Sequence, residues 1–350
     1  MKSLVLVLGA GASKEVGLPI GAELKSQIAR LLDIRFHHGS QQVSGDVQIT
    51  QSLRRIASQD GNGRGDINPY LHMCRRIRDA MPQAISIDNF IDSHAGEDKI
   101  ALCGKLAIAR AILSAESTST LTVDRSNINN KLDFAKNTNT WFNGFFQLLT
   151  ENCRLDDLPA RLKSIGVVTF NYDRCLEQFL FHALQNYYAI SPTEAAAALV
   201  NLEIHHPYGM VGRLPWMDQQ ETVEFGTEPN ATELISIAGQ LRTFTEGTNP
   251  TVSNIDVIRH LITEARRLTF FGFSFHRLNM SLLFGQPSPE TSQVTTSIYA
   301  TAFGISSSDC RHIANELSTK TGLPNGPMQV RNDLTCAGLV QEYWRSLSLN

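Results

Sequence analysis

The sequence predicts an α/β fold in which helices cover both faces of a parallel sheet. Short apolar runs recur along the chain, first at 3–8 and later at 165–170, 268–271 and 297–303. Unbroken runs of this length are typical of strands buried on both faces. Small or polar residues end each run, and a helical pattern follows, as in strand–turn–helix units. The 350 residues are 42% hydrophobic, which suffices for one large core.

The first run leads directly into the small-residue segment Gly9-Ala-Gly-Ala-Ser13. Its glycines allow a sharp turn and a close approach of the backbone to a ligand. Ser13 is placed to cap a helix whose free N–H groups favour an anion, and apolar spacing over 20–32 predicts that the turn leads into an amphipathic helix. We therefore predict a diphosphate seat in a Rossmann-like sheet. Lys14 replaces the third glycine of the G-x-G-x-x-G pattern, and a glycine turn without a ligand is the alternative.

The chain changes character between its first and second predicted strands. Gly, Ser, Gln, Asn and Asp dominate 37–68, which predicts an inserted loop, and helical patterns without a strand signal follow to about 157. We expect a single domain over 1–350 with a mostly helical insertion at about 37–160. Ser86 begins one of its helices and places Asp88 and Asp92 one turn apart. Helix capping or a paired-carboxylate site would explain these two acids.

Polar residues follow the second predicted strand, 165–170. Asn171 and Asp173 stand just beyond its carboxyl end, where an open α/β sheet places its ligand crevice. They are candidates for chemistry, and an Asn–Asp turn with a helix cap is the structural alternative. A helix is predicted from Arg174 to Tyr188 by its apolar spacing.

Two neighbouring histidines end the third predicted strand, 202–206. Side chains of adjacent strand residues point to opposite faces, so only one of His205 and His206 faces the crevice. An imidazole there can act as a general base near neutral pH, and a buried, hydrogen-bonded ring is the alternative. Without a third Cys, His or carboxylate at ligand spacing, the pair predicts no metal site.

The later part of the chain repeats the strand–turn–helix pattern. A helix at 254–265 precedes the strand 268–271, whose end at Gly272 is followed by Ser274 and Asn279, both able to bond a ribose or phosphate. Ser307 opens a helix after the strand at 297–303. A closing helix is predicted at 337–349.

Bulk properties exclude several functional classes. The net charge of −3 gives no basic stripe, so direct binding of nucleic acid is not expected. Six scattered cysteines without a C-x-x-C pair argue against a zinc ribbon and suit a reducing compartment. No apolar stretch approaches the length of a membrane span. We expect a cytoplasmic protein.

Taken in this order, the motifs resemble those of the sirtuin family, in particular its bacterial NAD-hydrolase branch in anti-phage defence. The resemblance spans about 4–284. The similar segments are the phosphate loop Gly9-Ala-Gly-Ala-Ser13 with Gly17-Leu-Pro19, the nicotinamide-ribose motif Thr169-Phe-Asn-Tyr-Asp173, the histidine segment His206-Pro-Tyr-Gly209, the adenosine-side element Gly272-Phe-Ser274, and Ser86-Ile-Asp-Asn-Phe90.

The resemblance implies an enzyme that releases nicotinamide from NAD, with NAD as its substrate and no metal. Asn171, His206 and Asp173 would be catalytic. The residues implied in NAD binding are Gly9, Ala10, Gly11, Ala12, Ser13, Pro19, Thr169, Gly272, Ser274 and Asn279. It further implies a regulated effector that depletes NAD when assembly or a partner activates it. A homo-oligomer is expected, with a partner such as a nucleic-acid-directed ATPase or a short Argonaute.

Two departures from the family pattern leave alternatives open. Tyr208 stands before Gly209, where the family has its histidine, so we assign the base to His206 while His205 or an altered role stays possible. The paired C-x-x-C module of sirtuin-type protein deacylases is missing, which favours simple NAD cleavage over deacylation. A non-catalytic sensor of NAD or ADP-ribose is the third alternative.

Overall fold

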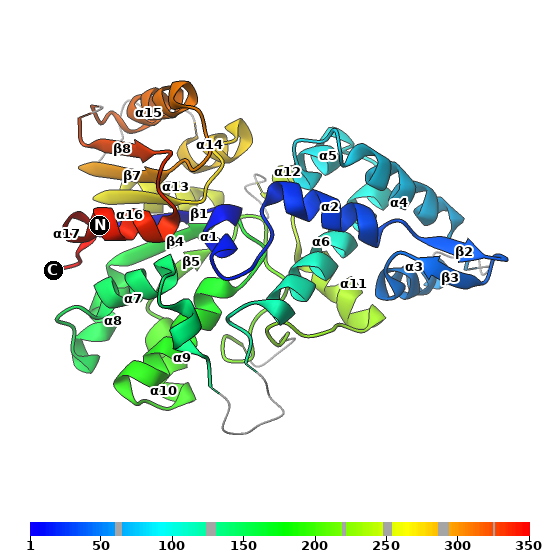
Figure 1. Ribbon diagram of the computed structural model, residues 1–350, viewed down its shortest axis with the longest axis horizontal. Coiled ribbons are helices and arrows are strands. Elements are labelled where there is room, and N and C mark those ends of the chain that lie inside the picture. The colour runs from blue at the N-terminus through cyan, green and yellow to red at the C-terminus, as the bar shows by residue number, and fades with distance from the viewer. Residues whose placement is uncertain (60–64, 124–130, 219–221, 248–253, 286–293, 325) are drawn as a thin grey trace. The chain divides into compact units, whose positions relative to one another are not determined.

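The computed structural model describes residues 1–59, 65–123, 131–218, 222–247, 254–285, 294–324 and 326–350 (Figure 1). The chain divides into two compact units. The first unit comprises 1–17, 120–207 and 248–350, and the second comprises 18–119 and 208–247. Parts of the predicted insertion, 60–64 and 124–130, lie outside the described residues.

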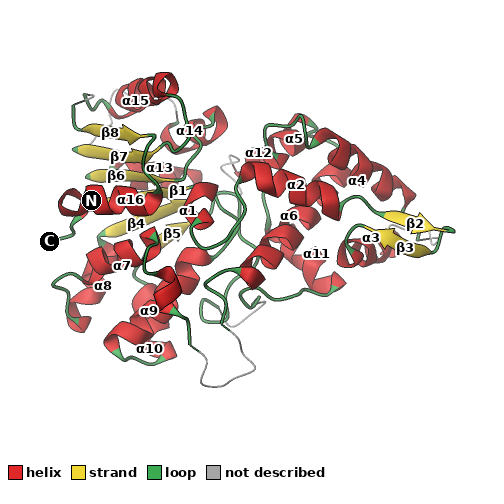
Figure 2. Ribbon diagram, in the orientation of Figure 1, coloured by secondary structure: helices red, strands yellow, loops and turns green. Residues whose placement is uncertain are grey.

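The first unit contains a six-stranded sheet in the order β5-β4-β1-β6-β7-β8 (Figure 2). All neighbouring strands are parallel. The strands are β1 (Leu4–Leu8), β4 (Ile165–Thr169), β5 (Glu203–His205), β6 (Arg267–Phe271), β7 (Ser297–Thr301) and β8 (Met328–Arg331). From β1 the chain adds β4 and β5 on one side, and it then adds β6, β7 and β8 on the other side. This is the order of a Rossmann-like sheet, whose switch point lies between β1 and β6.

Helices cover both faces of this sheet, as predicted. Gly166 of β4 is in register with Val5 and, through it, with Leu268, so the three share one face. There a Cβ on Gly166 would lie 2.6 Å from a methyl of Leu261 in α13 (Ile255–Thr263). Phe271 is three residues past Leu268 and therefore points to the other face. Its ring centroid lies 4.8 Å from that of Trp141, the first residue of α7.

The remaining helices of the first unit connect or flank the strands. They are α1 (Ala10–Lys14), η1 (Phe134–Asn137), α7 (Trp141–Thr150), η2 (Leu155–Asp157), α8 (Leu158–Lys163), α9 (Cys175–Tyr188), α10 (Pro192–Leu199), α14 (Arg277–Phe284), α15 (Ser307–Thr321), α16 (Cys336–Glu342) and α17 (Trp344–Leu347). Glu15, next to α1, accepts hydrogen bonds from the N–H groups of Trp141 at 2.7 Å and Ala337 at 2.9 Å. One carboxylate thus accepts a hydrogen bond from a free N–H in the first turn of both α7 and α16.

The second unit is mainly helical. Its elements are α2 (Gly21–Leu31), β2 (Arg35–His37), β3 (Gln41–Ser44), α3 (Val47–Gln59), α4 (Asn68–Ala80), α5 (Ile87–Ser93), α6 (Asp98–Thr118), α11 (Ala231–Gln240) and α12 (Phe244–Gly247). The helix α6 is 21 residues long and contacts α2, α4 and α11. The helix start predicted at Ser86 is present, because its hydroxyl accepts a hydrogen bond from the Asn89 N–H at 3.0 Å.

The boundaries of the second unit differ from the expected insertion at about 37–160. The helices α7 and α8 belong to the first unit, and residues 208–247 join the second unit from a later part of the chain. The prediction of a loop over 37–68 is wrong, because this stretch contains β3 and α3. In α3 the buried residues Ile49, Leu53 and Ala57 recur every four positions, which is helical spacing hidden by polar neighbours.

Candidate active site

Two glycine segments meet where β1 and β6 end. The N–H of Gly9 donates to the carbonyl of Phe271 at 3.0 Å, and that of Gly11 donates to Gly272 at 3.1 Å. A Cβ on Gly272 would lie 2.1 Å from the backbone nitrogen of Ala12, and Gly272 has a φ of +57°. The packing of one backbone against another therefore requires these glycines. This packing accounts for the glycines without a ligand, as in the alternative interpretation of a glycine turn that binds no phosphate.

Ser13 links the first strand end to the second. It lies buried inside α1, which begins after Gly9, so the predicted helix cap is wrong. Its hydroxyl donates to Asp173 Oδ1 at 3.0 Å and accepts from Asn171 Nδ2 at 3.1 Å. The hydroxyl thereby ties the glycine loop to the segment that follows β4.

The side-chain amide of Asn171 is fixed by two acceptors. Its Nδ2 donates to the carbonyl of Gly9 at 3.1 Å and to the hydroxyl of Ser13. A carbonyl only accepts, so the NH₂ group must face Gly9, and this determines which way the amide points. Asn171 Oδ1 accepts no hydrogen bond from the residues that the structure describes. Asn171 as a whole is 8% exposed, its amide has a defined orientation, and Oδ1 remains as an acceptor for a further hydrogen bond.

The turn around Asn171 is stabilised locally. Its N–H donates to Thr169 Oγ1 at 3.2 Å, and Asp173 Oδ1 accepts from the N–H of Cys175, the first residue of α9, at 3.1 Å. The Asn–Asp turn anticipated as a structural alternative is thus present. It also holds the Asn171 amide against the glycine loop, so the turn and the site geometry coexist.

His206 lies beside Asn171 and is deeply buried. Its Nδ1 is 3.3 Å from the carbonyl oxygen of Asn171, and its Nε2 is 2.7 Å from Glu177 Oε1 on α9. The side chains of His206 and Glu177 are only 4% and 2% exposed. Burial alone would lower the pKa of His206, but the Glu177 carboxylate, the Asn171 carbonyl and Asp173 outweigh it and raise that pKa above its ordinary value.

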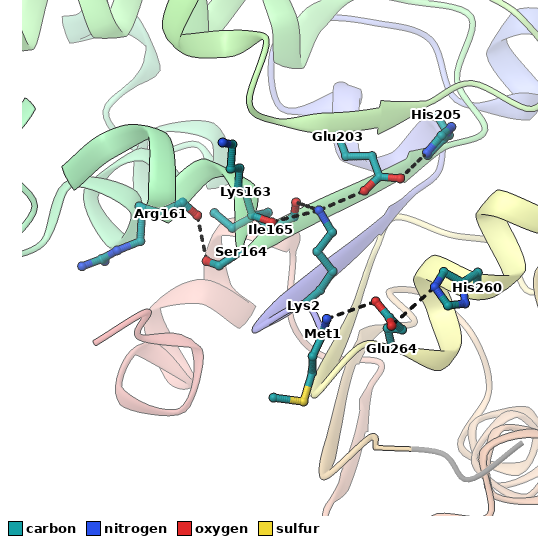
Figure 3. A network of polar contacts seen from close by, with 10 residues as sticks. All are labelled: Met1, Lys2, Arg161, Lys163, Ser164, Ile165, Glu203, His205, His260 and Glu264. Carbon is teal, nitrogen blue, oxygen red and sulfur yellow. Dashed lines mark hydrogen bonds and ion pairs between the residues drawn. The ribbon is translucent and has the colours of Figure 1, made fainter. Parts of the chain in front are cut away.

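His205 turns to a different set of groups, shown in Figure 3. Its Nε2 lies 2.8 Å from Glu203 Oε1, and the second oxygen of Glu203 lies 2.9 Å from Lys2 Nζ. Lys2 also donates to the carbonyls of Lys163 and Ile165, at the start of β4. Of the two neighbouring imidazoles, His206 is therefore the one placed next to Asn171.

Several residues expected in NAD binding lie outside this network. Ser274 is exposed in the loop after β6, and Asn279 is half-buried on α14. Neither bonds to Asn171, Ser13 or His206. Ala10 is exposed at the start of α1, Ala12 is buried in the same helix, and Pro19 belongs to the second unit.

Tyr208, the departure from the family pattern, also belongs to the second unit. Its ring is buried, and burial together with the charges of Asp88 and Asp92 raises the pKa of its phenol. The two acids, one turn apart on α5, therefore act on a tyrosine of their own unit.

Glu177 was not anticipated as a site residue. It lies in the first turns of α9, between the buried residues Leu176 and Gln178, and its partner His206 is 29 positions away. A signal was nevertheless present in the sequence. Leu180 and Leu184 lie three and seven positions after Glu177 and are buried on the same helical face, so an acid there needs a buried partner.

Comparisons with known proteins assign no family. No protein-family model matches the chain, and no curated protein was found to be similar to it. Among the described residues, no group of three or more His, Cys, Asp or Glu side chains is arranged to hold a metal ion. In the same part of the chain, every helix is too short or too polar to cross a membrane.

Proposed function

We propose that the chain hydrolyses NAD to nicotinamide and ADP-ribose. The observation that carries this proposal is the Asn171 amide, which is locked by Gly9 and Ser13 and keeps Oδ1 as an acceptor. It stands at the carboxyl ends of β1 and β4, and sheets of this strand order bind dinucleotides at that edge. The resemblance of the motif order to the NAD-hydrolase branch of the sirtuins supports the same substrate.

Each residue has a defined part in the proposed reaction. The C–N glycosidic bond breaks through an oxocarbenium-like state, and the bonding electron pair goes to the ring nitrogen of nicotinamide. Asn171 Oδ1 accepts a hydrogen bond from a ribose hydroxyl or from the attacking water, and Asp173 supplies negative charge near the developing cation. His206 takes the proton of the water, a role that contributes about 10²–10⁴-fold in typical enzymes. The diphosphate rests on 9–13.

The proposal includes regulation, because unrestrained hydrolysis of NAD would be toxic. We place the activity in the cytoplasm, since all six cysteines are free and buried. The resemblance to defence effectors favours an oligomer that is activated by assembly or by a partner such as a nucleic-acid-directed ATPase or a short Argonaute. Activation by a partner is tested by comparing nicotinamide release with and without that partner.

The decisive experiment follows nicotinamide release from NAD by the purified chain, with and without the product of the neighbouring gene. Asn171→Ala should abolish release while its circular dichroism matches the wild type. The matched control is Asn201→Ala, which removes an amide that bonds only to carbonyls one turn back, at the end of α10, and should leave release unchanged. Full hydrolysis by Asn171→Ala would refute the assignment.

Two other outcomes would identify the alternative functions. Deacylation of an acyl-lysine peptide in the presence of NAD, without hydrolysis of NAD alone, would show a sirtuin-type deacylase. Tight binding of NAD or ADP-ribose without turnover, even with the partner present, would show a sensor.

A further inference from the structure

Both ring nitrogens of His206 face hydrogen-bond acceptors. Nδ1 lies 3.3 Å from the backbone carbonyl of Asn171, and Nε2 lies 2.7 Å from the carboxylate of Glu177. A carbonyl only accepts, and so does an ionised carboxylate. A neutral imidazole carries hydrogen on one nitrogen alone. Beside an ionised Glu177, a neutral ring would therefore leave one of the two contacts without a hydrogen.

Two arrangements satisfy both contacts. Either the ring is an imidazolium beside an ionised Glu177, or the ring is neutral and Glu177 carries the proton and donates it to Nε2. Both arrangements hold one proton more than a neutral ring beside an ionised carboxylate. The extra proton also neutralises the carboxylate charge within the pair, which matters because these side chains are only 4% and 2% exposed.

We infer that Glu177 is a positioning residue that keeps one extra proton on the His206–Glu177 pair, so that the reaction begins only after the pair has lost this proton. The inference rests on the proposed NAD hydrolysis for its functional consequence. Among the residues that the structure describes, the charged groups acting on the ring are the Glu177 carboxylate on α9 and the Asp173 carboxylate in the turn after β4. Both favour retention of the proton.

The chemistry of hydrolysis explains why the protonated pair is inactive. The oxygen of water attacks C1′, the C1′–N bond breaks, its electron pair leaves with nicotinamide, and the water must give up a proton. In neither arrangement can the ring accept it, because each ring nitrogen already carries a hydrogen or accepts one from Glu177. After the pair loses its proton, Nε2–H still donates to Glu177, and the lone pair lies on Nδ1, the nitrogen next to Asn171. Glu177 therefore also selects the tautomer that acts as the base.

A titration of the full-length chain without NAD tests the held proton directly. Nitrogen-15 labelling of the histidines, with His206 assigned from the spectrum of His206→Gln, gives the pH midpoint of this ring. The midpoint should lie above about 6.5 in the wild type. Glu177→Gln should lower the proton affinity of His206 by about 10- to 1,000-fold. The matched control Glu203→Gln, which alters the partner of His205, should leave it unchanged.

The pH profile of nicotinamide release tests the positioning role. On the acidic side the wild-type rate should fall about tenfold for each pH unit, in step with the deprotonated fraction of the pair. Glu177→Gln should move this limb to lower pH and leave the KM for NAD unchanged. A merely structural role would lower the rate at every pH without moving the limb.

The outcomes separate this inference from the proposed function. A wild-type midpoint at or below 6.5 would overturn the inference, whatever the activity, and this measurement needs no variant to fold. An unchanged midpoint in folded Glu177→Gln would overturn it as well. Absence of nicotinamide release at any pH, combined with the expected titration, would refute the proposed hydrolysis and leave the held proton established.

Discussion

His205 and His206 are neighbours in the sequence, and each is paired with a glutamate, but the two pairs occupy different surroundings. The side chains of His205 and Glu203 are 14% and 34% exposed, and Lys2 contributes a cation to the group. The side chains of His206 and Glu177 are 4% and 2% exposed, and their other contact is the carbonyl of Asn171. Burial and the third partner, rather than residue type, distinguish the two pairs.

The difference has energetic consequences. Ion pairs that water can reach contribute about 0–1 kcal/mol, because solvent screens them and their side chains lose freedom. Removing one partner of a buried pair costs about 3–5 kcal/mol, since the other is left without compensation. The first pair is therefore expected to contribute little to the free energy of unfolding. The second pair fixes a titratable group where chemistry is proposed.

The largest expected effect separates the two histidines by activity. His206→Gln should reduce nicotinamide release by about 10²–10⁴-fold, because the proposed general base is lost. His205→Gln should change the rate by less than about twofold, since its ring is bonded to Glu203. Initial rates at saturating NAD provide the measurement. Equal losses in the two variants would show that the contrast between the pairs has no catalytic meaning.

The next effect concerns the close backbone packing of Gly272 against residues 9–12, next to the Asn171 site. Gly272→Ala should destabilise the chain by about 3 kcal/mol or more, because the new Cβ would overlap the glycine loop and Gly272 has a positive φ. Gly239→Ala is the control, because its Cβ meets nothing within 4 Å in α11 and should stabilise by up to about 1 kcal/mol. Urea denaturation measures both. A mild effect at Gly272 would mean that the two loops separate easily.

The smallest effect concerns acid stability at the first pair. Burial alone would raise the pKa of Glu203, but bonds from His205 and Lys2 outweigh it and lower that pKa. A lowered carboxyl pKa stabilises the fold above the unfolded value of about 4.3, and this stability disappears as the pH falls through the folded value. Glu203→Gln should therefore cost less than about 1 kcal/mol at pH 7, and the cost should shrink as the pH is lowered toward 3. Denaturation midpoints at both pH values check the sign.

Much of the fold could be predicted from short-range patterns. Apolar runs bounded by small residues identified β1, β4 and β6, because strands buried on both faces leave a continuous signal. The strand Met328–Arg331 was missed, since it has four residues, a polar Gln329 and Arg331, and half-buried positions at the sheet edge. The hairpin of β2 and β3 was missed for the same reason, since neither strand forms an apolar run.

The candidate site was predictable where strand ends determine it and unpredictable where side chains select partners. Asn171 and His206 follow neighbouring parallel strands, so their proximity follows from the sheet order. That His206 bonds to Glu177, and Ser13 to Asp173, depends on how α9 and α1 lie against those strand ends. No local pattern encodes such distances, and the mistaken helix cap at Ser13 came from treating a long-range bond as a local one.

The route of the chain gives His206 one more property. The backbone passes from the first unit to the second at residues 17–18 and again at 207–208. The second of these crossings begins at the residue directly after His206. The first residue after that crossing, Tyr208, is buried in the second unit. The backbone at residue 206 therefore lies between two fixed points, strand β5 directly before it and the buried Tyr208 two residues after it.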